Sequence, residues 1–381
     1  MEHLYLKEEH RIFRASLRRF LDKEAYPYFD EWEEARMVPR SFWKKLGDQG
    51  YLAPVIPEEY GGAGVDFAYS VVINEELERV GSGLTGIGLH NDIVVPYLLS
   101  FGSEEQKRKW LPGCVTGDII TAIAMTEPGA GSDLAGIRTT AIRDGDSYIL
   151  NGQKTFITNG IASDLVLVAC KTNPSATPPH KGMSLLWVET GTAGFERGRQ
   201  LHKVGQHSQD TAELFFDNCR VPVTNLLGEE GMGFRYLTEK LQQERLIVGI
   251  AAQTAAEEVL ADTIQYVKTR QAFGQSISKF QNTRFKIAEL ATKVDVSRTF
   301  LDSLIASHMA GEDVVTRVSM AKWWNTDMAK EVVGECLQLH GGYGYIEEYK
   351  VARRYRDIPV MAIYAGTNEI MKTIIAKNLG L

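Results

Sequence analysis

The sequence predicts an α+β protein of three domains: an N-terminal helical domain, a central antiparallel β-barrel or β-sandwich domain, and a C-terminal bundle of the four-helix type. Apolar residues recur at helical spacing towards both ends of the chain, whereas the middle consists of short β-branched and aromatic runs. With 381 residues, of which 44% are hydrophobic, the chain is long enough to form several domains with a sizeable core.

The N-terminal helical domain is predicted over residues 1–117. Four apolar residues fall on one stripe of a helix with a 3.6-residue period: Phe13, Leu17, Phe20 and Leu21. The segment "SEEQ" at 103–106 has the pattern of a capping box, so a helix should begin there. The segment "PEEYGGAG" at 57–64 is too rich in glycine for a helix or a strand, and a loop is expected.

The central β-domain is predicted over residues 118–228. The expected strands lie in the runs "IITAIAM", "TTAIRDGDSYIL", "KTFITNG", "DLVLVAC", "GMSLLWVE" and "TAELFF". Asp144 and Gly145 form a hairpin signal between two of them. Because no helical pattern separates the strands, the order favours antiparallel pairing over a βαβ fold.

The C-terminal helical domain is predicted over residues 229–381. Long helical patterns with brief connections are typical of a bundle. The expected helices cover 231–268, 279–310 and 315–340, with a last short helix from about Thr367.

Charge and cysteine spacing exclude several classes of function. Lys and Arg number 42 against 49 Asp and Glu, a net charge of −7, and no dense basic run is present for nucleic acid or anionic lipid. The four cysteines lie far apart, which indicates buried thiols rather than a disulfide framework or a zinc site. The charged N-terminus and the absence of a long apolar run predict a cytoplasmic protein with no membrane span.

Several common catalytic motifs are missing. "AMTEPGAGSD" at 124–133 contains Gly129 and Gly131, but Leu134 stands where a dinucleotide fingerprint needs glycine. The chain has no H-E-x-x-H helix, no G-x-S-x-G elbow and no phosphate-binding P-loop, and no metal site is expected.

Each remaining segment has both a structural and a functional interpretation. The 124–133 turn is either a plain turn or a lining for a polar cofactor. In "KTFITNG", Phe156 and Thr158 share one strand face, which either suits a flat ring or belongs to a half-buried hairpin strand with a Thr on its edge. "QLHGGYGY" at 338–345 is either a Gly-Gly helix end or a contact for phosphate. Arg270 either packs its stem along the bundle or binds phosphate, and Thr367 is an N-cap whose helix start can receive negative charge.

The order and spacing of these segments resemble one family over nearly the whole chain, the acyl-CoA dehydrogenases. The matching segments are "AMTEPGAGSD", "KTFITNG", "RQAFGQ" through "FQ", "QLHGGYGY" and "IYAGTNEI". The resemblance implies FAD as cofactor, an acyl-CoA substrate, and oxidation to the trans-2-enoyl-CoA, the first step of fatty acid β-oxidation. It also implies a homo-oligomer, expected to be a tetramer, and an electron-transfer flavoprotein as electron acceptor.

The resemblance also assigns roles to individual residues. Near the isoalloxazine it places Met125, Thr126, Phe156 and Thr158, and further along the cofactor Thr367 and Glu369. Residues matching positions that contact the FAD of a neighbouring subunit are Arg270, Gln281, Gln338, Gly341 and Gly342. Ser132 matches a residue that touches both the flavin and the thioester arm. The other expected substrate contacts are Lys181, Gln242, Gln243, Arg245 and Gly366.

The catalytic base is the decisive residue of this resemblance. Most of the family carries a Glu before the Gly-Thr of the "IYxGT" loop, but this chain has Ala365 there. In the long-chain and isovaleryl branches the acid lies on the helix after the β-domain, and "QQERL" matches it with Glu244 beside Arg245. Glu244 precedes an uncharged run at 246–256, so its pKa should rise towards neutrality. The backbone N–H of Ala365 is expected to meet the thioester oxygen.

The leading hypothesis is therefore dehydrogenation of a long-chain or branched-chain acyl-CoA, with Glu244 removing the α-proton and FAD N5 taking the β-hydride. Gln242 departs from the Asp of medium-chain relatives, which favours the long-chain branch. The alternatives are an acyl-CoA oxidase that uses oxygen, a dehydrogenase of isovaleryl- or citronellyl-type branched acyl-CoA, and a flavin-binding scaffold without catalysis.

Overall fold

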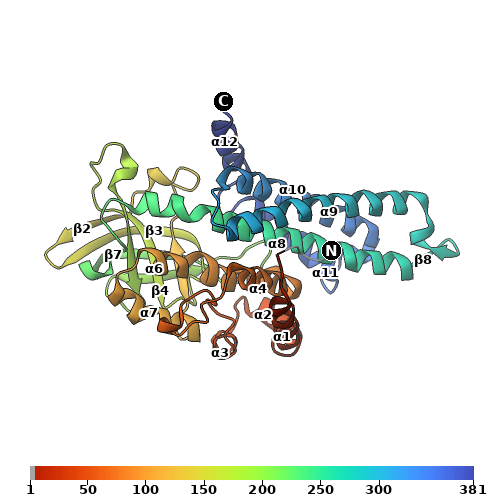
Figure 1. Ribbon diagram of the computed structural model, residues 1–381, viewed down its shortest axis with the longest axis horizontal. Coiled ribbons are helices and arrows are strands. Elements are labelled where there is room, and N and C mark those ends of the chain that lie inside the picture. The colour runs from red at the N-terminus through yellow and green to blue at the C-terminus, as the bar shows by residue number, and fades with distance from the viewer. Residues whose placement is uncertain (1–4) are drawn as a thin grey trace.

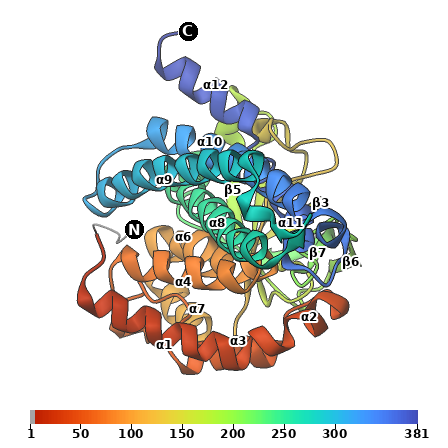
Figure 2. The same ribbon diagram turned by 90° about the vertical axis from the view of Figure 1, so that its right-hand side faces the viewer.

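A computed structural model describes residues 5–381, in which helical regions lie on either side of a β-sheet region in the sequence. In space, the sheet lies at one end of the molecule and the long helices α8, α9 and α10 extend from it to the other (Figure 1). Seen along these helices, α1 and α3 lie on one side of α8, with α4 and α6 between, and α9 and α10 lie on its other side (Figure 2). The predicted order of helical, strand and helical domains is confirmed. The domain limits at 117/118 and 228/229 stay predictions.

The N-terminal region is built from helices that pack around two cores. Ser103 accepts from Gln106 N at 3.2 Å and Gln106 Oε1 accepts from Ser103 N at 3.2 Å, so the predicted capping box is confirmed. The segment 57–64 holds one short 3₁₀ turn at Glu58–Tyr60 within the expected loop. The helices are α1 Glu8–Glu24, α2 Phe29–Ala35, α3 Arg40–Asp48, α4 Phe67–Val80, α5 Thr85–Gly88, the π-helix η4 Leu89–Val94, α6 Val95–Phe101 and α7 Glu104–Thr116.

The central region is a seven-stranded sheet. Its strands are β1 Thr121–Ala124, β2 Thr140–Asp144, β3 Ser147–Thr158, β4 Leu165–Lys171, β5 Met183–Glu189, β6 Phe195–Gln200 and β7 Thr211–Pro222. The hairpin between β2 and β3 turns at Gly145, which has a φ of 63°, as predicted. Antiparallel pairing holds for β2–β3, β3–β7, β6–β7 and β4–β5.

The antiparallel prediction needs a correction at β1, which pairs with β4 in parallel, as β2 does at Thr140 and Lys171. The reason is that β4 is buried on both faces, so its run "LVLVACK" shows no alternation from which pairing could be read. Val166 and Val168 pack into the core of the sheet, whereas Leu165 and Leu167 pack against the helices α6 and α7. β4 thereby joins the sheet to the N-terminal helices.

The C-terminal region is a helical bundle. Its helices are α8 Gly233–Thr269, α9 Gln281–Met309, α10 Val315–His340, α11 Lys350–Asp357 and α12 Asn368–Asn378, with a small hairpin of β8 Gln271–Ala272 and β9 Gln275–Ser276. The predictions for α8, α9 and α10 agree with these bounds to within two residues. Thr367 is the N-cap of α12, as expected. Strand β6, helix α11 and the β8–β9 hairpin were not predicted.

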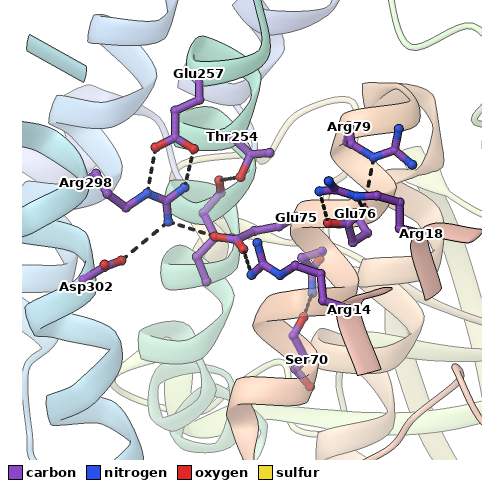
Figure 3. Close-up of polar contacts among 12 residues, drawn as sticks. Arg14, Arg18, Ser70, Glu75, Glu76, Arg79, Thr254, Glu257, Arg298 and Asp302 are labelled. Atoms are coloured by element: carbon purple, nitrogen blue, oxygen red, sulfur yellow. Dashed lines mark hydrogen bonds and ion pairs between the residues drawn. The ribbon is translucent and has the colours of Figure 1, made fainter. Parts of the chain in front are cut away.

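Buried charges join the N-terminal helices to the bundle (Figure 3). Arg298 of α9 lies between Glu75 of α4 and Glu257 of α8, with distances of 2.8 Å and 2.7 Å. Arg14 of α1 contacts the other oxygen of Glu75. One arginine therefore ties three helices together, with a fourth joined through the shared carboxylate.

All four cysteines are buried and free, in agreement with the prediction. Among residues 5–381, no helix combines the length and the apolar character that crossing a membrane requires. The same residues contain no cluster of His, Cys, Asp and Glu arranged to hold a metal ion.

Candidate active site

The candidate site lies where the three regions of the chain meet. One core cluster contains Tyr97 of α6, Trp187 of β5, and Tyr236 and Leu237 of α8, and Met125 packs against it. The first part of α8 runs beside the sheet (Figure 1). Side chains from all three regions therefore reach the part of α8 that precedes its uncharged run.

Glu244 lies on α8 in this region and is 3% exposed. Its Oε1 accepts a hydrogen bond from the Tyr97 hydroxyl at 2.6 Å. Burial raises the pKa of Glu244 to about 7, against the opposing effects of the Tyr97 hydroxyl, Arg245 and Lys240. The predicted rise in pKa is confirmed, and the side chain can exchange a proton near neutral pH.

Arg245 faces α10 rather than Glu244. Its Nη1 donates to Ser319 Oγ at 3.5 Å, and its buried Nε has no hydrogen-bond partner among residues 5–381. One turn further along α10, the fully buried Lys322 donates to the carbonyl oxygen of Gly366 at 2.8 Å. Adjacent turns of α10 thus hold both Arg245 and the loop that contains Ala365.

The Ala365 loop has a backbone that few side chains tolerate. Ala365 has a φ of 50° and Gly366 a φ of 86°, both in the left-handed region. The φ of Gly366 favours glycine there, and a Cβ would also lie 2.9 Å from the flexible end of the Met371 side chain. Ala365 packs against a cluster that includes Val248, one turn after Glu244 on α8. The loop with Ala365 and the part of α8 that follows Glu244 therefore belong to the same core.

On the sheet side, two predicted cofactor segments are hydrogen-bonded to each other. Thr155 N donates to Thr126 O at 2.9 Å, and Lys154 Nζ donates to Met125 O at 3.0 Å. Lys154 is fully buried and also contacts Glu127 Oε1 at 2.8 Å. Burial lowers the pKa of Lys154, and the Glu127 carboxylate opposes that change. This buried pair fixes the turn after β1 against β3.

Phe156 and Thr158 share the open face of β3, as predicted. Phe156 is 68% exposed, whereas Ile157 on the other face is 2% exposed. Phe156 has a φ of 59°, at a point where the register between β3 and β7 shifts. An exposed ring on a strained backbone is typical of a ligand contact. Ser132 is exposed in the turn between β1 and β2.

Thr367 begins α12 and accepts from Ile370 N at 3.3 Å. Asn368, which follows it, contacts Lys322 Nζ at 3.1 Å, so the helix start is held by the same lysine as the Ala365 loop. Glu369 is exposed in the first turn. The first turn of α12 is therefore fixed in place next to the Ala365 loop.

A second group of predicted cofactor residues lines an open groove at the far end of the bundle. The groove has a volume of about 480 Å³ and includes Arg270, Gln338, Gly341 and Gly342. The Arg270 guanidinium lies over the Tyr343 ring at 5.2 Å and pairs with no carboxylate among residues 5–381. Nothing lies within 4 Å of a Cβ built on Gly341 or Gly342, so both backbones are open to a ligand. Gln281 is exposed at the start of α9 and does not line the groove.

The two groups are far apart within one chain. Arg270 follows Glu244 by 26 residues along α8 and its end, which at 1.5 Å per helical residue is about 39 Å. Figure 1 shows the β8 hairpin at the end of the bundle opposite to the sheet. The sheet-side residues and the groove of one chain therefore cannot hold the same part of one ligand.

Three predicted substrate residues lie in different surroundings. Gln243 donates to the carbonyl of Asp92 at 2.7 Å and so faces the wall made by η4. The Gln242 amide makes its hydrogen bonds near the connection between α9 and α10: its Nε2 contacts His308 Nδ1 and donates to Glu312 O, and its Oε1 accepts from Val314 N. The structure therefore does not bring the Gln242 amide to Glu244. Lys181 is exposed in a 3₁₀ turn before β5.

The sequence did not single out Tyr97, Lys154 or Lys322. Each is fully buried and holds a predicted site segment through a long-range contact. A lysine within a strand or helix pattern was the available signal for Lys154 and Lys322, but it could not reveal their partners. Tyr97 lies in the "GIGLHNDIVVPYL" stretch at 86–98, which the sequence suggests as the floor of the substrate pocket, but no pattern in it indicates that Tyr97 contacts Glu244.

Three family models match the chain in sequence order. Residues 7–118 match the acyl-CoA dehydrogenase N-terminal domain, residues 122–219 the middle domain, and residues 231–380 the C-terminal domain.

Individual relatives agree with these matches. The long-chain specific mitochondrial acyl-CoA dehydrogenase of Sus scrofa is 47% identical, covering 97% of this chain and 86% of the relative. The crystal structure of an acyl-CoA dehydrogenase from Geobacillus kaustophilus has a TM-score of 0.99 at 67% identity, covering 100% of both chains. A glutaryl-CoA dehydrogenase from Mycobacterium smegmatis in complex with FADH2 has a TM-score of 0.91 at 31% identity, covering 98% of this chain and 95% of that chain.

Proposed function

The chain belongs to the acyl-CoA dehydrogenase family of FAD-dependent oxidoreductases, and from that premise we propose that it oxidises long-chain or branched-chain acyl-CoA with Glu244 as the base. The observation that carries the proposal is the buried Glu244, whose pKa is raised to about 7, together with Ala365 in the loop where most relatives place the acid. The similarity to long-chain enzymes supports the substrate class.

The residues of both groups fit FAD. The open ring of Phe156 beside Thr158 suits a flat heteroaromatic group, and the start of α12 suits a polar part of the cofactor. Arg270 with the bare backbones of Gly341 and Gly342 suits a pyrophosphate. When bound, FAD supplies the acceptor for the hydride that leaves the β-carbon.

Because the groove at Arg270 is far from the sheet-side residues, we assign it to the FAD of a second copy of the chain. Arg270, Gln281, Gln338, Gly341 and Gly342 then complete a neighbour's site, which requires at least a dimer and supports the expected tetramer. Each subunit would contribute both kinds of contact.

Glu244 acts as a base only as a carboxylate. With a pKa of about 7, it is half ionised at neutral pH and takes the α-proton of the thioester more readily as the pH rises. Its apolar surroundings exclude water, and the same burial makes the carboxylate more basic. The substrate α-carbon must lie against the Glu244 carboxylate for this step.

The thioester oxygen gains negative charge as the α-proton leaves. The left-handed backbone at Ala365 allows its N–H to serve as the donor to that oxygen, and Lys322 fixes the loop through the Gly366 carbonyl. The buried Arg245 Nε, which has no hydrogen-bond partner within residues 5–381, can orient the substrate arm. Ser132, Lys181, Gln243 and Gly366 remain proposed substrate contacts, whereas Gln242 is engaged elsewhere.

Electron transfer to a flavoprotein is proposed with this function, and the cytoplasmic location stays a prediction. An oxidase with the same fold would deliver electrons to oxygen instead. The two are separated by measuring peroxide during aerobic turnover, because an oxidase forms it at rates near turnover.

The test of the substrate class is anaerobic addition of acyl-CoAs of increasing length, straight and branched, to the FAD-loaded protein. Loss of flavin absorbance measures the oxidation of each acyl-CoA. We expect the fastest loss with palmitoyl-class or branched substrates. If all of these leave the flavin oxidised, the proposal is wrong.

A further inference from the structure

The chain segment that faces Glu244, from η4 to α6, is called the η4–α6 wall here, and it contains an irregular helix that Pro96 explains. The helical path from α5 to α6 widens into the π-helix η4 at Leu89–Val94, and Pro96 is the second residue of α6, which follows it. Proline has no N–H, so Pro96 cannot supply the α-helical hydrogen bond to the carbonyl of Asp92, four residues earlier. π-Turns of this kind frequently occur at functional sites.

Helix α8 donates a side chain to that carbonyl. Gln243 Nε2 donates to Asp92 O at 2.7 Å. The next residue of α8 makes a second contact, because Tyr97 of α6, five residues after Asp92, donates its hydroxyl to Glu244 Oε1 at 2.6 Å. Two adjacent residues of α8 are thus fixed at two points on the η4–α6 wall.

The Tyr97 hydroxyl is a permanent donor. Tyr97 is fully buried, and burial followed by the Glu244 charge raises its pKa well above the usual value, so it stays protonated. A phenol that donates to a carboxylate stabilises its charged form and fixes the direction of the accepting oxygen. Arg245 does not provide this contact, because its guanidinium bonds to Ser319.

We propose that Tyr97 is the positioning residue of the base, holding Oε1 of Glu244 so that the second carboxylate oxygen is directed at the α-carbon of the substrate. This inference rests on the proposed function of Glu244. The Gln243 contact sets the position of α8 along the wall, and the Tyr97 contact sets the rotation of the carboxylate. Tyr97 also offsets part of the cost of keeping that carboxylate ionised away from water.

The other charged and titratable groups near Glu244 make their hydrogen bonds to groups other than its carboxylate. On α8, Lys240 donates to Ser100 Oγ at 2.6 Å. On η4, Asp92 accepts from Asn74 at 2.7 Å, and on α10 Lys322 bonds to the Gly366 carbonyl. His308 of α9 bonds to Gln242. Tyr97 is therefore the group whose removal changes the hydrogen bonding of Glu244 directly.

The test compares Tyr97→Phe with Tyr148→Phe. Tyr148 is also buried and donates to a glutamate, Glu230, at 3.0 Å, but it lies on β3 outside the Glu244 cluster. The measurement is the pH dependence of single-turnover flavin reduction by acyl-CoA. For Tyr97→Phe we expect the acid limb of the pH profile to move up by about 1 pH unit, because the variant lacks the donor that stabilises the ionised Glu244 carboxylate. The rate at pH 7 then falls about fivefold, while KM changes less than twofold.

Tyr148→Phe should keep the wild-type profile. An isosteric second variant replaces Tyr97 by 3,5-difluorotyrosine, whose more acidic hydroxyl is a stronger donor and should move the limb down. A wild-type profile in both Tyr97 variants overturns the inference, as does a change in KM alone.

A readout independent of catalysis separates this inference from the proposed function. The difference in unfolding free energy between each protein and its Glu244→Gln form, followed against pH, reports the pKa of Glu244. Tyr97→Phe should shift that curve to higher pH by the same amount. If wild-type flavin is not reduced by any acyl-CoA, the proposed function fails, but a shifted stability curve still supports the Tyr97 contact and an unshifted one refutes it.

Discussion

Glu75 and Glu244 are two buried glutamates with opposite surroundings. Glu75 is 4% exposed and Glu244 is 3% exposed. Glu75 is met by the guanidinium groups of Arg298 and Arg14 (Figure 3). Glu244 receives a hydrogen bond from one phenol, and the neighbouring Arg245 bonds to Ser319 instead. Two equally buried glutamates therefore differ in the groups that meet their carboxylates.

The difference lies in how each charge is compensated. The guanidinium groups of two arginines contact the Glu75 carboxylate, which thereby joins α1, α4 and α9. Glu244 is compensated only in part, and its pKa is raised to about 7. A buried carboxylate that lacks full compensation is costly for the fold and useful for proton transfer.

The largest expected contrast is in catalysis. Glu244→Gln removes the base and should slow flavin reduction roughly 1,000-fold, within the range known for general bases. Glu75→Gln should leave the rate per folded active site within about twofold. Anaerobic stopped-flow measurement of flavin reduction checks both. Equal rates for wild type and Glu244→Gln would show that another group removes the proton, and no reduction in either protein would favour a flavin-binding scaffold over an enzyme.

The next contrast is in stability. Glu75→Gln leaves Arg298 buried with less negative charge, which should lower the free energy of unfolding by about 3 kcal/mol. Glu257→Gln is the matched control, because Glu257 binds the same arginine but its side chain is 34% exposed, and its loss should cost about 1 kcal/mol. Urea titration of the FAD-loaded proteins at pH 8 measures both. Equal losses of unfolding free energy in the two variants would show that burial of the carboxylate does not decide how much its ion pair with Arg298 contributes.

The smallest expected effect is a gain in the free energy of unfolding rather than a loss. Glu244 has a pKa of about 7 in the folded protein against 4.5 when unperturbed, so the folded state binds more protons between these values and loses stability as the pH rises through them. Glu244→Gln removes that loss and should raise the free energy of unfolding at pH 8 by about 1–3 kcal/mol. The gain should vanish below about pH 4.5. A free energy of unfolding lower for Glu244→Gln than for wild type at pH 8 would contradict the contrast with Glu75.

The sequence could identify one of these glutamates but not the other. Glu244 stood out because Ala365 replaces the usual acid and an uncharged run follows. Glu75 lies in "NEELERV", which reads as an exposed helix surface, yet the acids in it are buried. Its partner Arg298 lies 223 residues away. Local periodicity carries no information about such a contact.

The same limit applies to the fold and the rest of the site. The long helices and most strands follow from period and turn residues, but the parallel pairing of β1 with β4 depends on which buried strands meet in space. Phe156 and Thr158 could be placed on one face from alternation alone. Tyr97 could not be assigned, because its role depends on the break at Pro96 and on a carboxylate 147 residues later.

The most direct measurement is a crystal structure of the FAD-loaded protein with an acyl-CoA analogue that cannot be oxidised. The Glu244 carboxylate should lie about 3–3.5 Å from the α-carbon of the analogue, the separation of a reactive complex, with Tyr97 still bound to its other oxygen. A Glu244 side chain directed away from that carbon, with another acid in its place, would contradict the account.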